Sequence, residues 1–264
     1  MKTYRYVKLD PTGNITCLVL EPAPAEDEEQ LTRELLKQCE QVAYLESAAV
    51  PGAVAAIRLM GGEFCGNAAM AAAAWLVRDE LKDGEELSFL LQVSGAAEPV
   101  PCRIRRTSDA YEGTAEMPPV REIRKETFEG TAFTLVRTDG IAHLIYEGNT
   151  LDREAAEGLL KRMAASLPDD AVGLLQWNRQ TQQMQPLVYV RGSGSLVWET
   201  GCGSGSAAAG ILEAIRRGDG IHRIPVKQPG GVIRVTAVTE KGTLLSVSIT
   251  GQVRIGPESV IEIP

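Results

Sequence analysis

The feature of this sequence that most constrains its fold is a short cysteine-containing segment that occurs twice, about half a chain apart. One copy surrounds Cys65 and the other surrounds Cys202. In both, the cysteine is followed by a glycine, a polar residue, small residues and a run of alanines. Repetition at this spacing predicts an internal duplication. We therefore expect two similar domains, each with a glycine-rich turn that leads into an alanine-rich helix and contributes one loop to a shared cleft.

The length and the hydrophobic pattern are consistent with two domains. The chain has 264 residues, 44% of them apolar, which is enough for two modest hydrophobic cores. Short alternating segments in both halves predict strands, and further helices are expected at about 28–44 and 152–165. Pro118 and Pro119 are typical of a linker. The predicted domains are 1–119 and 120–251.

The composition excludes several kinds of partner. The formal net charge is −8, with 27 basic and 35 acidic side chains, whereas a nucleic acid or an acidic membrane would require a basic patch. No apolar run reaches the roughly 20 residues that span a bilayer, and the N-terminus lacks an apolar signal segment. We therefore expect a cytoplasmic protein without a membrane or nucleic-acid partner.

The cysteine and histidine content predicts free thiols and no metal site. The chain has five cysteines, no CxxC pair and only two histidines, which leaves little material for a zinc site. An odd number of cysteines in a chain without an export signal indicates free thiols. Three of them have no special sequence context and are expected to be packing residues: Cys17, Cys39 and Cys102.

The two repeated cysteines, by contrast, are predicted to be reactive. Asn67 and Ser204 are residue types favoured at helix N-caps, so each cysteine should lie at a helix N-terminus. The unpaired N–H groups and the positive dipole end found there favour anions and lower the pKa of a thiol. A glycine beside the thiol lets a ligand approach the backbone. The predicted site therefore contains Cys65, Gly66, Asn67, Cys202, Gly203 and Ser204.

Two such thiols suit a reaction at the α-carbon of an amino acid. Inverting that centre requires removal of a proton from one face and delivery of a proton to the other, which one base cannot easily do. A thiolate on one face and a thiol on the other can exchange these roles. Helix N-termini directed at the substrate carboxylate would stabilise the charge that develops. The pattern predicts a two-base racemase or epimerase.

At these loops the sequence resembles the diaminopimelate epimerase superfamily. The matching motifs are Phe-Cys-Gly-Asn at 64–67, Glu-Thr-Gly-Cys-Gly-Ser-Gly at 199–205 and an N-terminal segment at 8–14 that ends in Asn14. The resemblance implies an α+β fold with two pseudo-symmetric domains, each a β-barrel-like sheet around a central helix. It implies that the last strand, 252–264, crosses back to the first domain and that Asn14 contacts the substrate. It also implies that neither pyridoxal phosphate nor a metal is used.

Three stretches differ from the diaminopimelate epimerases, at 58–63, 140–143 and 195–198. In those enzymes, these stretches carry polar groups that hold the distal end of diaminopimelate, and a charged group left unpaired in a closed site is costly. The run Met-Gly-Gly-Glu-Phe-Cys at 60–65 and the N-terminal segment most resemble histidine racemases, which supply D-histidine to opine-type metallophore synthesis. The resemblance implies interconversion of L- and D-histidine, and a homodimer is among the expected assemblies.

The groups that hold the amino group and the side chain of the substrate stay open. Glu46, Glu199 and His143 are candidates, although an isolated glutamate in a loop is commonly solvated. Trp198 or Phe64 would suit packing on an imidazole, and each would equally suit a hydrophobic core.

Other functions also stay open. The parent activity, diaminopimelate epimerisation, is one alternative. Another is a proton-shifting isomerase of the same fold, related to phenazine-pathway enzymes, in which a carboxylate replaces the thiols; the presence of both cysteines counts against it. The third is a binding module without catalysis.

Overall fold

A computed structural model describes residues 1–192 and 194–264 as an α+β protein. The chain divides into two compact units. Unit 1 comprises Met1–Glu116 and Thr250–Pro264, and unit 2 comprises Met117–Ile249; the sequence-based boundaries were 119 and 251. Within the described residues, no helix combines the length and the apolar character needed to cross a membrane.

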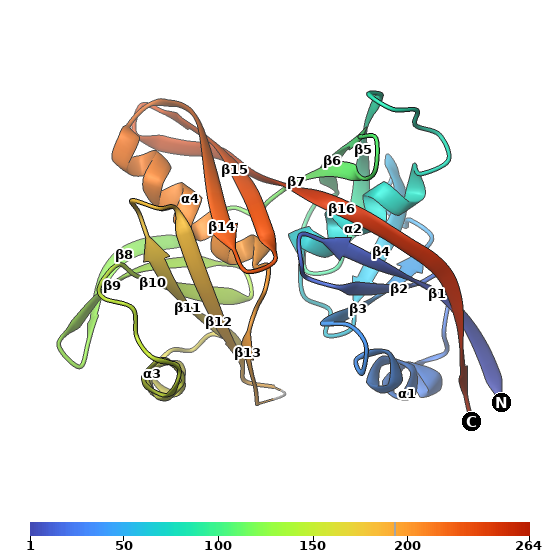
Figure 1. Cartoon of the computed structure of the whole chain (residues 1–264), viewed down its shortest axis with the longest axis horizontal. Helices are drawn as coiled ribbons and strands as arrows, with labels where there is room; N and C mark the ends of the chain where they lie inside the picture. The colour runs from blue at the N-terminus through green and yellow to red at the C-terminus, as the bar shows by residue number, and fades with distance from the viewer. Residues whose placement is uncertain (193) are drawn as a thin grey trace. The chain divides into compact units, whose positions relative to one another are not determined.

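Unit 1 contains two helices and a ring of strands (Figure 1). The final strand, β16, begins in unit 2, and from Thr250 onward it pairs in unit 1 with both β7 and β1, which closes the ring. The elements are β1 Lys2–Pro11, β2 Thr16–Val19, α1 Ala25–Leu35, β3 Gln41–Glu46, β4 Ala53–Leu59, α2 Gly66–Leu76, β5 Glu86–Val93, β6 Val100–Arg106, β7 Tyr111–Glu116 and β16 Thr243–Ile263.

Unit 2 has the strand order β8-β9-β10-β11-β12-β14-β15, and β13 pairs with β12. Its elements are β8 Glu122–Phe128, β9 Thr131–Thr138, β10 Ile141–Tyr146, α3 Arg153–Ser166, β11 Ala171–Asn178, β12 Gln183–Val190, β13 Ser195–Trp198, α4 Gly203–Arg217, β14 Gly220–Gln228 and β15 Gly231–Glu240. The first residues of β16, from Thr243 to Ile249, also belong to this unit.

The two units repeat the same strand pairings. In unit 1, α1 connects the parallel pair β2 and β3, and α2 connects the parallel pair β4 and β5. In unit 2, α3 connects the parallel pair β10 and β11, and β13 followed by α4 leads from β12 to β14, which are also parallel. The strands between these pairs are antiparallel in both units. The predicted pseudo-symmetric α+β fold is thus confirmed, with the sheet forming a ring rather than a clear barrel.

Each unit has helices on both faces of its strands. In unit 2, Leu144 and Leu174 belong to the core cluster under α3, whereas Leu175 lies against the first turn of α4. Because successive side chains of a strand point to opposite faces, the strands are buried on both sides and their sequences are nearly continuous apolar runs. In unit 1, Tyr4 and Tyr6 of β1 pack with Leu31 of α1 in the same way.

The helices α2 and α4 lie close to their strands because small residues meet at the contacts. The residues of α2 from Gly66 to Trp75 are all buried. A Cβ added at Gly113 of β7 would lie 2.9 Å from the Cβ of Met70. A Cβ added at Gly210 of α4 would lie 2.5 Å from a methyl carbon of Val235. Glycine and alanine therefore set the distance between helix and sheet.

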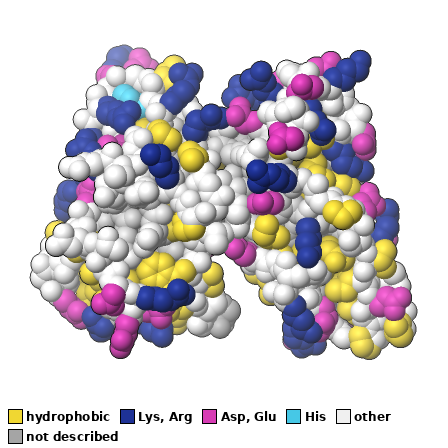
Figure 2. Space-filling model, viewed as in Figure 1, with side chains coloured by type: hydrophobic (Ala, Val, Ile, Leu, Met, Phe, Trp, Pro, Cys, Tyr) yellow, Lys and Arg dark blue, Asp and Glu magenta, His cyan; other side chains and the backbone are white. Residues whose placement is uncertain are grey.

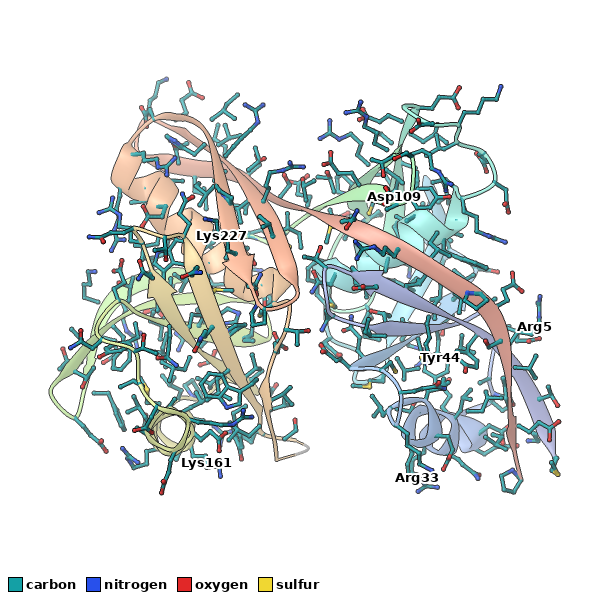
Figure 3. All side chains as sticks on the ribbon, in the orientation of Figure 1. Arg5, Arg33, Tyr44, Asp109, Lys161 and Lys227 are labelled. Atoms are coloured by element: carbon teal, nitrogen blue, oxygen red, sulfur yellow. The ribbon has the colours of Figure 1, made fainter. Side chains whose placement is uncertain are left out.

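The predicted helix at 28–44 is wrong in its second half, since α1 ends at Leu35 and β3 occupies Gln41–Glu46. This strand is buried between β2 and β4, and its pairing with both provides backbone hydrogen bonds that outweigh helical continuation. Tyr44, labelled in Figure 3, lies on β3 and its hydroxyl is 2.7 Å from the Thr32 hydroxyl of α1. Besides β3, four further strands were not predicted: β7, β8, β13 and β14.

The charged side chains of both signs are interspersed on the face of each unit that Figure 2 shows. Among the described residues many charged side chains are paired, for example Arg216 with Glu147 at 2.5 Å and Arg137 with Asp169 at 2.8 Å. On the face drawn in Figure 2, the described basic side chains form no continuous surface of the kind that binds nucleic acid.

The contrast between two helical glycines tests this packing. Gly210→Ala should lower the free energy of unfolding by about 2 kcal/mol, because the new Cβ clashes with Val235. Gly158→Ala in α3 meets only the flexible end of Arg162 and should stabilise the protein by about 0.5–1 kcal/mol, the ordinary gain of alanine over glycine in a helix. Urea denaturation of both variants measures the difference. Equal effects would contradict the close contact.

Candidate active site

Cys65 and Cys202 are themselves the N-cap residues of α2 and α4. The sequence-based expectation that Asn67 and Ser204 would be the caps was wrong. The Cys65 sulfur accepts a hydrogen bond from the Ala68 N–H at 3.5 Å, and the Cys202 sulfur accepts one from Gly205 at 3.3 Å. Each sulfur thus takes the place that a serine or asparagine oxygen has in an ordinary cap, and the same geometry occurs in both units.

In unit 1, Ser94 and Gly95 support the loop that leads to Cys65. The Ser94 hydroxyl accepts a hydrogen bond from the Leu59 N–H at 2.9 Å and donates one to the Glu63 carbonyl at 2.8 Å. Gly95 has a φ of 72°, and a Cβ there would lie 2.3 Å from the Phe64 nitrogen. A side chain is therefore excluded by both the backbone conformation and the lack of space.

In unit 2, Gln228 and Ser206 hold the loop around Cys202. The Cys202 N–H donates to the Gln228 side-chain oxygen at 2.7 Å, and the Gln228 amide donates to the Ser206 hydroxyl at 2.8 Å. The Ser206 hydroxyl donates in turn to the Cys202 carbonyl at 2.6 Å. Sequence reasoning missed Gln228 and Ser206, as it missed Ser94 and Gly95. Gln228 ends the unpredicted strand β14, so no local pattern identified it.

The surroundings of Cys202 favour the protonated thiol. Cys202 is 3% exposed, whereas Cys65 is half-buried. Burial raises the pKa of the Cys202 thiol well above its usual value, and the negative charge and hydrogen bond of Glu199 raise it further. The Ser204 hydroxyl and the Gly205 N–H lower this pKa by a smaller amount. The expectation that a helix N-terminus leaves this thiol with a lowered pKa was therefore wrong, because loss of water outweighs one helix end.

His143 lies behind Ser204. Its Nε2 atom is 3.0 Å from the Ser204 Oγ, and that oxygen is 3.6 Å from the Cys202 sulfur. The imidazole is 1% exposed, and burial lowers the pKa of His143 to about 4, so the ring is neutral at physiological pH. The geometry thus connects His143 to Cys202 through Ser204 rather than exposing it for direct contact with a ligand.

Asn14 and Glu46 have protein partners within unit 1. The Asn14 amide donates to Glu40 at 2.8 Å, and its oxygen accepts from Gln41 at 2.7 Å. Glu46, at the end of β3, accepts from Arg58 at 2.8 Å, and Arg58 also donates to Glu28. Their predicted contact with a substrate stays a prediction.

The remaining predicted residues lie close to the two thiols or next to the second loop. Gly66 and Gly203 are the buried first residues of α2 and α4, and Asn67 is 2% exposed. Trp198 donates its indole N–H to Glu157 at 2.8 Å and packs against the core under α3. The Trp198 indole is thereby held toward α3.

The other three cysteines have the surroundings of packing residues, and all five cysteines are free. Cys17 lies in the core under α1, with Cys39 packed against it. Burial raises the pKa of Cys102 to about 12. Over residues 1–192 and 194–264, no three His, Cys, Asp or Glu side chains are grouped as metal ligands would be.

The chain is similar in sequence to known racemases and epimerases. The family model "Histidine racemase CntK N-terminal domain" matches residues 3–261. A histidine racemase from Staphylococcus aureus is 29% identical over 260 residues, which cover 94% of this chain and 93% of that protein. A diaminopimelate epimerase from Xanthomonas euvesicatoria is 28% identical over 75% of this chain and 74% of its own length.

A solved structure shares the fold. The hydroxyproline epimerase of Agrobacterium vitis aligns with a TM-score of 0.72 at 15% identity, over 98% of this chain and 92% of that one. At this identity the similarity shows the fold alone.

Alkylation of the native protein tests the state of the thiols. Iodoacetamide should label Cys65 before Cys202, because Cys202 is less exposed and reacts only as the thiolate. The ordinary pKa of a cysteine thiol is 9.0, and that of Cys202 lies above it. The thiolate fraction of Cys202, and with it the labelling rate, should therefore still increase when the pH is raised above 9.0. Peptide mass spectrometry measures both rates.

The same assay tests the charge of Glu199. Glu199→Gln should label Cys202 severalfold faster at a fixed pH, because it removes the negative charge that raises this pKa. Glu240→Gln, at an exposed position, is the control. Slower labelling in Glu199→Gln would contradict the effect of Glu199 on the pKa of Cys202. Labelling of Cys202 before Cys65 would contradict the lower reactivity of the Cys202 thiol.

Proposed function

The chain belongs to the histidine racemase family, and on this premise we propose that it interconverts L- and D-histidine with the thiols of Cys65 and Cys202 as its two bases. The observation that carries the proposal is the repeated cap. In each unit a cysteine sulfur accepts the N–H three residues later, at the start of a buried helix. Two equivalent proton-transfer groups are what inversion at one carbon requires.

The proposed reaction needs only proton transfers. One cysteine, as the thiolate, removes the α-proton of the amino acid and becomes a thiol. The other, as the thiol, donates its proton to the opposite face of the same carbon and becomes a thiolate. The roles are reversed for the other enantiomer, so the enzyme requires no net oxidant or reductant.

The first turns of α2 and α4 would stabilise the charge that develops on the substrate carboxylate. The N–H groups of Ala68 and Gly205 are used by the sulfurs. The preceding backbone N–H groups at a helix start lack intrahelical partners and favour anions. The first of them at each helix belongs to Gly66 or Gly203, whose lack of a side chain allows close approach.

The burial of Cys202 suggests how the thiols divide the work. Burial and Glu199 hold Cys202 in the thiol form, which suits the proton donor of the resting enzyme. Cys65, which is more exposed, would then act first as the base. Glu199 is hydrogen-bonded to the Cys202 thiol, so in our proposal it acts on this proton rather than on the substrate amino group.

The stretches that differ from diaminopimelate epimerases support a substrate without a second charged head. Arg58 is engaged by Glu28 and Glu46. The strand β13, Ser195–Trp198, presents mainly apolar side chains, and its Trp198 is bonded to Glu157. A distal carboxylate and ammonium would thus meet few available partners, whereas the neutral imidazole of histidine would lose little.

The cysteines provide the first test. Cys65→Ser and Cys202→Ser should each lower racemisation of L-histidine by several orders of magnitude, because a hydroxyl is far too weakly acidic to exchange roles at neutral pH. Polarimetry measures the activity, with enzyme that was treated with chelator and dialysed without pyridoxal phosphate. Cys102→Ser is the control and should retain it. Wild-type turnover in either active-site variant would contradict the two-base mechanism.

A comparison of two substrates provides the second test of the proposed function. We expect kcat/KM for L-histidine to exceed that for diaminopimelate by at least about a hundredfold, or about 2.7 kcal/mol in transition-state binding. Buried groups left without partners cost ~1–3 kcal/mol each, and diaminopimelate has several. Equal values, or a preference for diaminopimelate, would mean that the parent activity is retained.

An isomerase of the phenazine type is less consistent with this chain. Solved structures named as phenazine biosynthesis proteins align with it at 14% and 12% identity, which shows only a shared fold. Deuterium exchange from heavy water into the α-position of histidine separates a racemase from such an isomerase acting on other substrates.

We also propose that the enzyme is a cytoplasmic homodimer that supplies D-histidine to opine-type metallophore synthesis. The likeness of the run at 60–65 and of the N-terminal segment at 8–14 to histidine racemases supports the role in metallophore synthesis. Sedimentation analysis would measure the assembly.

A further inference from the structure

Two cysteines outside the cysteine loops lie against each other in unit 1. Cys17, on β2, is fully buried in the core under α1, and Cys39 packs against that core from the segment between α1 and β3. Their side chains are hydrogen-bonded to each other, sulfur to sulfur. Thiols this close need only a small movement to reach the bond length of a disulfide.

The pairing of β2 with β3 brings the two cysteines together. Cys17 is paired with Val42 in the parallel register. Just before β3, the Glu40 N–H donates to the Ile15 carbonyl at 2.9 Å. Cys39 directly precedes Glu40, so this backbone hydrogen bond holds the segment that contains Cys39 alongside β2. The contact between the sulfurs is therefore fixed by the fold rather than by two freely moving side chains.

The Cys39 sulfur is surrounded by hydrogen-bond donors. They are the Cys17 thiol and the backbone N–H groups of Cys17 and Gln41, and together with the charge of Lys8 they lower the pKa of Cys39 despite its burial. In the opposite sense, the protonated thiol donates to the Leu35 carbonyl at 3.2 Å. Cys39 is half-buried. It is thus a thiol with thiolate character that a small molecule in solution can reach, as reactive cysteines are.

The same hydrogen bond has the opposite effect on Cys17. Cys17 is the donor, so the bond, together with burial, raises the pKa of Cys17 above its usual range. The residue is 0% exposed, which prevents direct attack by a reagent in solution. The pair is therefore asymmetric. Cys39 can react with a molecule from outside, and Cys17 can react only with its neighbour.

We propose that Cys17 and Cys39 form a site of reversible oxidation, at which hydrogen peroxide converts the two thiols to an internal disulfide. The Cys39 thiolate attacks one peroxide oxygen. The S–O bond forms, the O–O bond breaks, and the departing hydroxide takes a proton and becomes water. The peroxide is reduced by two electrons, and the Cys39 sulfur is oxidised by two electrons to a sulfenic acid.

Cys17 completes the reaction. Its sulfur attacks the Cys39 sulfur, the S–S bond forms and the S–O bond breaks. The hydroxide that leaves takes the proton of Cys17 and becomes the second molecule of water. Two thiols and one peroxide thus give one disulfide and two molecules of water, and a thiol reductant reverses the change.

The disulfide would join the two segments that hold Asn14. The Asn14 amide donates to Glu40 at 2.8 Å, and Glu40 is the residue after Cys39. The bond would also close the chain between 17 and 39, which contains α1, and would restrict the unfolded state there. Oxidation at this site uses neither of the thiols of the proposed reaction, so the inference does not depend on the proposed function.

Peptide mass spectrometry of the native wild-type protein tests the inference. After treatment with hydrogen peroxide, the remaining thiols are blocked with N-ethylmaleimide at mildly acidic pH during unfolding, which prevents exchange. We expect a disulfide-linked pair of peptides that contain Cys17 and Cys39, and dithiothreitol should return both to free thiols. Cys102 is the internal control. Burial raises its pKa to about 12, so it should stay reduced.

Two variants test the order of the steps. Cys39→Ser should lower the oxidation of Cys17 at least about tenfold, because peroxide reaches Cys17 only through Cys39. Cys17→Ala should stop the reaction at the sulfenic acid, which dimedone traps on Cys39. Cys102→Ser is the matched control and should form the disulfide as the wild type does. If Cys17→Ala does not fold, dimedone added to the wild type together with the peroxide should give the same Cys39 adduct.

Three results would overturn the inference. The first is that Cys17 and Cys39 both stay reduced in samples in which peroxide has oxidised Cys65. The second is equal oxidation of Cys17 in Cys39→Ser and in the wild type. The third is a linked pair of peptides that forms only when the protein is unfolded before treatment. Racemisation of L-histidine by untreated protein is measured separately, and its absence would refute the proposed function without affecting the disulfide.

Discussion

The buried helix whose first N–H groups meet a cysteine sulfur is the interaction on which the rest of each unit depends. A helix start buried without partners would be costly, and here Cys65 and Cys202 satisfy one donor each. The cap places each sulfur at the first turn of its helix, and the many glycines and alanines of the two helices allow them to be buried closely against the strands. The position before each buried helix therefore needs a side chain that accepts a hydrogen bond from the helix, and in the proposed reaction the same side chain transfers the proton.

The two units share the cysteine cap but differ in the residues that hold the cysteine loop in place. In unit 1 a serine and a glycine of the turn after β5 hold the backbone before Cys65. In unit 2 a glutamine from β14 binds the backbone N–H of Cys202 itself. The second thiol is more deeply buried and has Glu199 beside it. Two topologically equivalent cysteines thus have different surroundings, which suits a reaction whose resting enzyme needs one acid and one base.

Because the strands of unit 2 are buried on both faces, the polar groups near Cys202 have few possible hydrogen-bonding partners. Most inward positions of β10 and β11 are aliphatic, so His143 has few polar neighbours. Its one hydrogen-bonding nitrogen meets Ser204, and its ring occupies the space that Gly173 leaves. A single polar side chain in an apolar layer has one orientation that satisfies it, and that orientation leads toward Cys202.

The sequence by itself determined the duplication, the α+β class, the two cysteine loops and the family, because these depend on local patterns: a repeated motif, periodic hydrophobicity and glycine-rich turns. It did not determine which residue caps each helix, since Asn67 and Ser204 are better intrinsic caps than cysteine. It did not reveal Gln228, Ser94 or the strand that follows α1, whose partners are distant in sequence. It also predicted the wrong direction for the pKa of Cys202. A helix N-terminus is a local feature, but the loss of water around a thiol is decided only when the strands and Glu199 close around it.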